Sequence, residues 1–565
     1  MINILISSIF SSIILISYGA LFNKLFFSKK LENVDPRVAG IYGFIIVGFI
    51  SLYLNFFFPI NKIIGTVFFI FSLIFFIFYF IKLEKKNEFI LLVFFVSITS
   101  FLVVTLSNIN RPDAGLYHLP YISILQENKV ILGLTNLHYR FGHTSIFQYI
   151  SAIYNNYFLK NEFINFPLAS LISFYILYLF KNFNESLRRK KKIETVSIFL
   201  IIIFSLYSFN RYSNYGNDAP ASIYFFILIL LTLKIENIKK IDIENFFNIL
   251  IISIFLLTIK PFMVIVFALP LFLFLLNNNK IRILKHKNSL ICVLLIISWV
   301  VKNFLISGCA IFPIKETCIN KINYYDAAIT NIASTEAEAW SKAHPDSINK
   351  LSFNEYISNY NWVNTWFKSH FKKIMEKLTP FLLFLILFFL IKITRKPYFD
   401  NFNYKFFFKN KNILLIIFFS LYCCFFWFLK FPVYRFGMAF ISSFIIFLFI
   451  NLFVTEKFFY NKKTYYSIIG IGLILFYGKN LNRIFNNLDL TYNNYPWPKI
   501  YSMSNEDENI KKKFIRVTDD KNNFIYYYSN GEECMYSNTP CSNYYKDDLL
   551  KKSVLGYSIY FFKID

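Results

Sequence analysis

The feature that most constrains this chain is a series of strongly apolar stretches, each close to the length of a membrane-spanning helix. Four of them precede the first long polar segment, at about 3–23, 38–60, 63–82 and 89–107. A helix needs about 20 consecutive apolar residues to cross a bilayer, and shorter runs suffice for a buried core helix. Since 56% of the 565 residues are hydrophobic, the sequence predicts an all-α polytopic membrane protein.

Ten further stretches complete a predicted set of about 14 transmembrane helices. They lie at about 163–181, 193–210, 219–234, 246–260, 262–277, 289–306, 378–393, 412–429, 436–454 and 464–478. The segment 144–158 is too polar for a span, and we expect it to form an interfacial helix instead.

Basic residues in the connecting segments predict the orientation of these spans, because Lys and Arg favour the cytoplasmic side of short loops. The basic segments are 23–37, 82–88, 188–192, 234–240 and 277–287. The predicted spans place all of them on one side, so both termini and the loop that contains Asp113 fall outside. The first stretch has neither a basic start nor a small-residue cleavage site, and it is therefore predicted to be a retained anchor.

The net charge of +26 follows the same division. Segment 307–375 has seven Lys against six Asp or Glu, and segment 479–565 has twelve Lys or Arg against eleven acidic residues. Both predicted outer segments are thus nearly neutral, and most of the positive charge lies in predicted cytoplasmic loops. The charge indicates orientation and gives no case for nucleic-acid binding.

Four of the seven cysteines form two close pairs in predicted outer segments, Cys309 with Cys318 and Cys534 with Cys541. An oxidising compartment allows disulfides there, so we expect both pairs to be bonded. Zinc binding is the weaker interpretation, because no neighbouring His or Cys completes a four-ligand set. The other three cysteines lie in predicted spans, where a thiol acts as a small apolar group.

The predicted organisation has six parts. They are an N-terminal four-helix membrane segment (1–107), an extracytoplasmic loop with interfacial helices (108–162), a central transmembrane bundle (163–306), an extracytoplasmic helical loop domain (307–377), a C-terminal transmembrane bundle (378–478) and a small extracytoplasmic α/β or β domain (479–565). The last part contains short β-rich stretches and a turn signal at Asn530-Gly531. The chain has no phosphate-binding glycine loop.

The polar stretch from Ser107 to Gln148 is the candidate functional region. It contains Asp113, Arg140 and three of the six His. Such residues are costly beside lipid unless they face water or a cavity, so a cluster of them at the membrane indicates a functional site.

Several short motifs, taken in order, resemble the GT-C class of membrane glycosyltransferases. Asp113 and Tyr117 form a D-x-x-x-Y pattern in RPDAGLYHLP, and a second acidic residue, Asp218, follows in a later outer loop. Lys260 and Pro261 interrupt an apolar pair in the way these enzymes do. The motifs HLP, NLHYRFG, SGCAIFP, PVYRFG and the late cysteine pair also resemble an uncharacterised family of bacterial multi-pass proteins with a GT-C-like layout.

The resemblance implies transfer of a sugar from a polyprenyl-phosphate-linked donor to a glycan or lipid acceptor, outside the bacterial inner membrane. A carboxylate must accept the proton of the acceptor, and Asp113 is the candidate base, with Asp218 as the second catalytic carboxylate. Cations must stabilise the departing phosphate. The candidate substrate-binding residues are Tyr117, His118, His138, Arg140, Lys260, Lys302 and Arg435.

The chain departs from the GT-C pattern in two ways. Four predicted spans precede Asp113 where these enzymes usually have one, and Ala114 stands where some members have a second adjacent carboxylate. These departures leave open both the exact role of Asp113 and the use of a divalent metal ion, and the resemblance implies no other cofactor.

Each candidate also has a purely structural interpretation. Asp113 could cap a helix or pair with Arg111, and Asp218 stands at a good N-cap position. Arg435 and Lys302 could extend from helix ends to lipid headgroups. The loop histidines could bind a metal ion, although their spacing matches no established metal motif.

Trp340, Trp362 and Trp366 could stack on sugar rings, but an interfacial aromatic belt is the expected role of most outer aromatics.

Three functions other than glycosyl transfer of the GT-C type remain as alternatives. A transporter or flippase of lipid-linked saccharides should have ionisable residues in mid-span or duplicated halves, and neither is conspicuous. A polymerase of the O-antigen type should have an Arg-rich late outer loop, and 307–377 has no Arg. A non-catalytic scaffold of the same fold is the remaining alternative.

Overall fold

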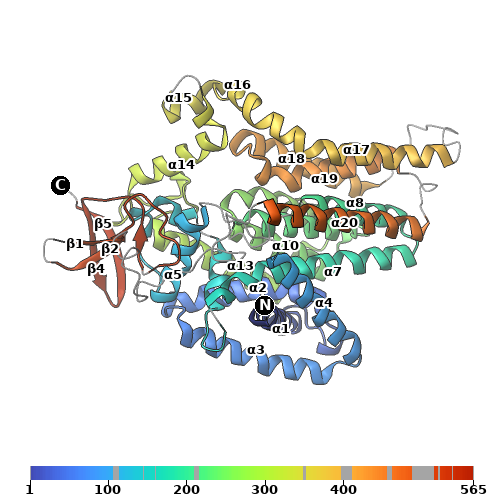
Figure 1. Cartoon of the computed structure of the whole chain (residues 1–565), viewed down its shortest axis with the longest axis horizontal. Coiled ribbons are helices and arrows are strands. Elements are labelled where there is room, and N and C mark those ends of the chain that lie inside the picture. Colours follow the sequence, from blue (N-terminus) through green and yellow to red (C-terminus); the bar gives the residue numbers. More distant parts are fainter. Residues whose placement is uncertain are drawn as a thin grey trace.

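A computed structural model describes residues 2–105, 113–143, 145–159, 161–208, 216–347, 351–395, 410–454, 461–486, 514–519, 522–537 and 539–563. Arg111, the alternative partner proposed for Asp113, lies outside these residues. The described chain is a bundle of long helices with a small β region at one end (Figure 1).

Helices occupy all of the stretches that were predicted to span the membrane. They are α1 (Ile2–Phe27), α2 (Pro36–Phe57), α3 (Lys62–Lys82), α4 (Lys86–Thr105), α7 (Phe166–Arg188), α8 (Lys192–Ser208), α9 (Asp218–Leu233), α10 (Ile243–Ile259), α11 (Ala268–Leu276), α13 (Lys287–Ser307), α17 (Lys372–Arg395), α18 (Lys411–Lys430), α19 (Tyr434–Phe453) and α20 (Lys462–Asn486). A 3₁₀ helix, Pro261–Phe267, precedes α11 within the stretch 262–277.

Eight of the described helices are long and apolar enough to cross a membrane. They are α1, α2, α3, α4, α7, α13, α18 and α19. Three shorter apolar segments, Asp218–Leu233, Ile243–Ile259 and Pro261–Leu276, lie among them. The chain is therefore a mostly helical membrane protein, and a total of 14 spans stays a prediction.

Helices α2, α3 and α4 pack around α1, which contacts each of them. Gly43 of α2 lies directly against the backbone of α1, since a Cβ at this position would overlap the carbonyl oxygen of Leu15. Small residues allow this kind of close approach between membrane helices. Helix α7 packs on α2 and α4 and so joins this group to α8 and the rest of the bundle.

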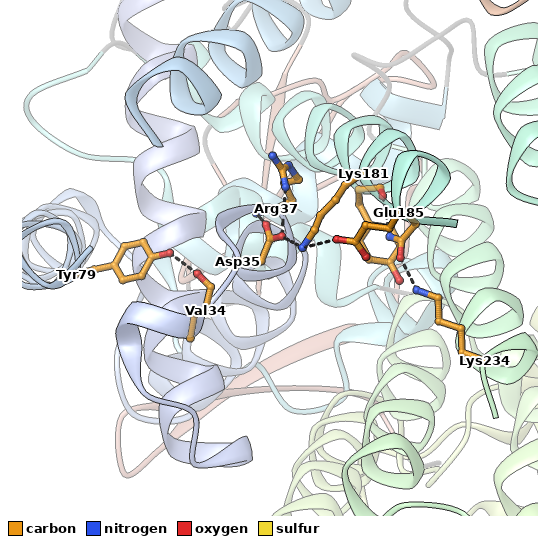
Figure 2. Close-up of polar contacts among 9 residues, drawn as sticks. Val34, Asp35, Arg37, Tyr79, Lys181, Glu185 and Lys234 are labelled. Atoms are coloured by element: carbon orange, nitrogen blue, oxygen red, sulfur yellow. Dashed lines mark hydrogen bonds and ion pairs between the residues drawn. The ribbon is translucent and has the colours of Figure 1, made fainter. Parts of the chain in front are cut away.

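Two loops predicted to be cytoplasmic, 23–37 and 234–240, contact the same end of α7 (Figure 2). Asp35 accepts hydrogen bonds from Lys181 and Arg37, and Lys181 lies 3.4 Å from Glu185. Nearby, the ammonium group of Lys234 donates to Asn182. Segments that the charge pattern assigned to one side thus lie on the same side of the bundle.

Segment 307–377 is helical, as predicted, with α14 (Ala327–Ser341), α15 (Phe353–Ile357) and α16 (Val363–Trp366). It covers the turn between α18 and α19, where the indole N–H of Trp366 donates to the carbonyl of Pro432 at 2.7 Å. Trp362 and Trp366 are buried against Phe428, so for these two the belt and the sugar-stacking interpretations are both wrong. Trp340 is exposed.

The C-terminal β region has two small sheets. One contains β1 (Ile515–Thr518), β2 (Phe524–Tyr528) and β3 (Cys541–Ser542), and the other contains β4 (Leu549–Val554) and β5 (Tyr557–Phe562). Strands β1 and β2 are antiparallel, β2 and β3 are parallel, and β4 and β5 form an antiparallel hairpin. Asn530 and Gly531 both have positive φ, as the predicted turn requires.

This β region docks on the loop that contains the candidate residues. The Leu132 N–H donates to Ser558 and its carbonyl accepts from Tyr560, both at 2.9 Å. The hydroxyl of Ser123 donates to Ser537, and that of Thr539 to Glu127. The same loop contains α5 (Leu119–Glu127) and α6 (Ile146–Ile153); α6 is buried against α2 and α5 and does not lie at a surface.

Both predicted disulfides are formed, Cys309–Cys318 and Cys534–Cys541. The other three cysteines are free thiols within helices. Since disulfides persist in oxidising compartments, the two bonds agree with an outer location for both segments.

Candidate functional site

Five charged residues that are far apart in the sequence meet at the end of the bundle that holds the β region. Asp113 precedes a π-helical turn, Ala114–His118, that leads into α5. Asp218 is the first residue of α9, and Arg435 is in the first turn of α19. Lys260 is the extended residue between α10 and the following 3₁₀ helix, and Arg140 belongs to the short 3₁₀ helix Tyr139–His143.

Arg435 bridges the two carboxylates. Its Nη1 lies 3.5 Å from Oδ2 of Asp113, and its Nε lies 3.6 Å from Oδ2 of Asp218. On the outer flanks, Arg140 Nη1 lies 3.8 Å from Oδ1 of Asp113, and Lys260 donates to Oδ1 of Asp218. We call these five residues the charged cluster. Asp113, Asp218 and Arg435, which the sequence analysis named separately as candidates, thus lie together.

Neither carboxylate serves as a helix cap. Asp113 takes the N-cap position of the π-helical turn, but its side chain makes no capping hydrogen bond. The N-cap of α9 is Asn217, which leaves Asp218 inside the first helical turn. An acidic residue there is favoured by the helix dipole. The interpretation of Asp218 as an N-cap is therefore wrong.

Aromatic rings fix the cations of the charged cluster. Arg140 lies over the ring of Tyr117 at 5.3 Å, and its Nε donates to the hydroxyl of Tyr139 at 3.1 Å. Lys260 lies over the ring of Phe436 at 3.7 Å. Contacts of this kind hold a cation in place without neutralising it. Tyr117 thus supports the cluster through the contact of its ring with Arg140.

His118 and His138 are buried next to the cluster. His118 Nδ1 is 2.6 Å from the amide nitrogen of Gln148, and burial lowers the pKa of His118 to about 4. His138 Nδ1 accepts from the backbone N–H of Arg140 at 3.1 Å, and burial lowers the pKa of His138 to about 3. Both imidazoles are neutral at pH 7, so they orient the loop and add no positive charge.

The contacts described for Lys302 lie outside the charged cluster. Its ammonium group lies over the ring of Trp299 and donates to Oδ1 of Asn303 at 3.0 Å. Among the described residues it forms no ion pair with Asp113 or Asp218. The side chain is fully buried inside the protein, so the interpretation that it extends to lipid headgroups is wrong.

A third carboxylate, Glu533, approaches from the β region and was missed by the sequence analysis. A Cβ at Gly115 would overlap its Oε2, and the Met535 N–H donates to the carbonyl of Gly115 at 2.8 Å. Burial, and then the charge of Asp113, raise the pKa of Glu533. Only its place directly before Cys534, the first residue of a predicted disulfide, could have drawn attention to it.

The charged cluster holds three cations against two carboxylates, and all five side chains keep part of their surface open to solvent. The three Arg distances exceed the roughly 2.7–2.9 Å of a tight charge-assisted hydrogen bond. A bound anion could therefore replace a carboxylate as the partner of an Arg or of Lys260. The released carboxylate could then accept a proton from a nearby hydroxyl group. Within the described ranges, no group of three His, Cys, Asp or Glu is placed to hold a metal ion.

A family model described as a domain of unknown function (DUF8201) matches residues 1–442. The matched region contains all five residues of the charged cluster, whereas Glu533 and the β strands lie beyond it. No curated protein and no solved structure matches the chain.

Proposed function

Starting from the premise that the chain belongs to the DUF8201 family, we propose that it is a membrane glycosyltransferase of the GT-C type. In this proposal it transfers a sugar from a polyprenyl-phosphate-linked donor to a glycan or lipid acceptor. The reaction takes place on the extracytoplasmic side of a bacterial inner membrane. About 14 spans, with both termini outside, complete the proposed topology.

One observation carries the proposal. Arg435 joins Asp113 and Asp218, which come from separate loops, while Arg140 and Lys260 flank them. Glycosyl transfer from a phosphate carrier needs a carboxylate base and cations within one site, because a proton is removed where negative charge also develops. The charged cluster has both, at the ends of apolar helices where a lipid carrier can reach them.

The proposed reaction is a single displacement. The acceptor hydroxyl oxygen attacks the anomeric carbon and gives its proton to Asp113. The bond from this carbon to the phosphate oxygen breaks, and its electron pair stays on the carrier phosphate. Arg435 and Lys260 take up that charge, Asp218 keeps both cations in position, and the anomeric configuration inverts because one C–O bond replaces another from the opposite face.

Binding of the carrier phosphate must loosen the ion pairs of the cluster. The two contacts of Arg435 exceed 3.4 Å, and its side chain is about two-fifths exposed. Exposed pairs of this kind contribute about 0.2–1 kcal/mol each, which is less than a charge-assisted bond to phosphate. We therefore expect the phosphate to draw Arg435 away from Asp113 and so free the base.

The test is sugar transfer in membranes, from a radiolabelled polyprenyl-phosphate donor, by the native chain and by Asp113→Asn. The substitution keeps the shape of the side chain and removes its basicity. We expect transfer to fall at least about a hundredfold, within the range for a positioned general base. The matched control is Asp548→Asn, an exposed acidic residue of the β region that forms no ion pair among the described residues.

If Asp113→Asn transfers sugar at the native rate, the assignment of the base is wrong. If the native chain transfers no sugar from any polyprenyl-phosphate donor in a panel of hexoses and pentoses, the proposed reaction is wrong. Equal losses of sugar transfer in Asp113→Asn and Asp548→Asn would mean that the change in surface charge, and not the removal of the base, lowers the rate.

A further inference from the structure

A basic hollow lies at the other end of the molecule, in the turn between α11 and α13. It has a volume of about 750 Å³ and is lined in part by the short helix α12 (Lys280–Leu284). Its walls are formed by Asn278, Asn279, Lys280, Ile281, Arg282, Lys285 and His286. The lining thus includes three permanent cations and no carboxylate, and the charge pattern predicts that it faces the cytoplasm.

The cations of this hollow are exposed. Lys280, Arg282 and Lys285 all have exposed side chains, and within the described part of the chain none of them forms an ion pair. Two other basic residues on this side have acidic partners: Lys181 pairs with Asp35, and Lys234 with Glu194. The hollow therefore keeps a concentrated positive charge.

The walls of the hollow are held in place. The Asn278 N–H donates to the carbonyl of Lys239 at 2.9 Å, which ties the turn to the loop before α10. On the opposite side, His286 Nδ1 accepts from the Asn288 N–H at 3.3 Å, and its ring packs on Phe247 at 5.0 Å. The turn is a defined structure that can hold a ligand without first being ordered.

Apolar side chains surround the hollow where lipid would lie. Ile281 and Leu284 of α12 are exposed by 69% and 63%. Helices α11 and α13, on either side, expose Leu275 and Leu290. Side chains like these are typical of a surface that contacts acyl chains, and a cationic hollow bordered by them lies at the level of the headgroups.

We propose that this hollow binds the headgroup phosphate of an anionic phospholipid. The cations pair with the phosphate, while Ile281 and Leu284 contact the upper part of the acyl chains. Basic pockets between membrane helices on the cytoplasmic side bind such headgroups. This site is independent of the charged cluster and of the proposed reaction.

The test is lipid retention by the full chain, purified in an uncharged detergent and measured by native mass spectrometry. The probes are phosphatidylglycerol and phosphatidylcholine of equal chain length, with free glycerol phosphate as competitor. We expect phosphatidylglycerol to be retained about tenfold or more over phosphatidylcholine. The variant Lys280→Gln/Arg282→Gln/Lys285→Gln should lose this preference, because it removes the three cations of the hollow that pair with the phosphate.

The matched control is Arg188→Gln/Arg189→Gln/Lys190→Gln, which removes the same charge from an exposed turn on the same predicted side. The control should keep the native preference. Equal retention of both lipids by the native chain would overturn the proposal, and this result needs no variant. Equal losses in both triple variants, or displacement of phosphatidylglycerol by equimolar glycerol phosphate, would overturn it too.

Discussion

Replacing Arg435 with Gln separates the role of this residue in the reaction from its role in the fold. The guanidinium is about two-fifths exposed and forms two loose ion pairs, with Asp113 and Asp218. At about 0.2–1 kcal/mol for each exposed pair, their loss lowers the free energy of unfolding by no more than about 2 kcal/mol. Most domains have about 5–15 kcal/mol, so the variant stays folded.

The expected effect on sugar transfer is much larger. Removing one group that stabilises developing negative charge costs about 2.7–4 kcal/mol, or a factor of about 10²–10³ in rate. The conservative Arg435→Lys keeps the charge, but one ammonium group cannot replace both the Nε and the Nη1 contacts. We therefore expect it to lose about tenfold and to lie between the native chain and Arg435→Gln.

The assay measures kcat/KM for transfer from a radiolabelled polyprenyl-phosphate donor, together with the thermal midpoint in detergent. The control is Arg516→Gln, an exposed residue of β1 that lies over the ring of Phe524. The reasoning is refuted if Arg435→Gln keeps more than half of the native kcat/KM. It is also refuted if Arg435→Gln loses activity because its thermal midpoint falls so far that the variant is unfolded at the assay temperature.

Three further predictions follow from the loop and the β region. Gly115→Ala should displace Glu533 and Met535 and lower transfer about tenfold, whereas Gly470→Ala, which has open space around it, should have no effect. Replacing Cys534 and Cys541 with Ser should lower the free energy of unfolding by about 2–3 kcal/mol, measured by thermal melting and by proteolysis of the β region. The buried His118 should make stability fall on acidification. Its folded pKa is about 4 and its ordinary value is 6.5, so between these values the unfolded state binds more protons. Up to about 3 kcal/mol is lost as pH falls through that window, and a His118→Asn variant should melt with a weaker pH dependence.

The sequence predicted the helices well because the bilayer imposes a length on each of them. Every predicted apolar stretch is helical in the described residues, and two of the basic loops, 23–37 and 234–240, meet at the same end of α7. Asp113, Asp218 and Arg435 were also identified as candidates, since each of them lies in a predicted outer loop or at the outer end of a predicted span.

The positions of Lys302, Trp362 and Glu533 depended on tertiary packing, which no local sequence pattern encodes. Lys302 lies near the predicted outer end of a span, but neighbouring helices bury it over Trp299. Trp362 resembles an interfacial residue in the sequence, yet it packs inside the loop domain. Glu533 comes within reach of Asp113 only because the β region folds back over 400 residues of chain to Gly115.

The most direct test of the charged cluster as the reaction site is a cryo-EM structure of the native chain with a polyprenyl phosphate bound. The account predicts the phosphate within about 4 Å of both Arg435 and Lys260, with Asp113 released from Arg435. A phosphate bound elsewhere, with the ion pairs of Arg435 intact, would contradict it.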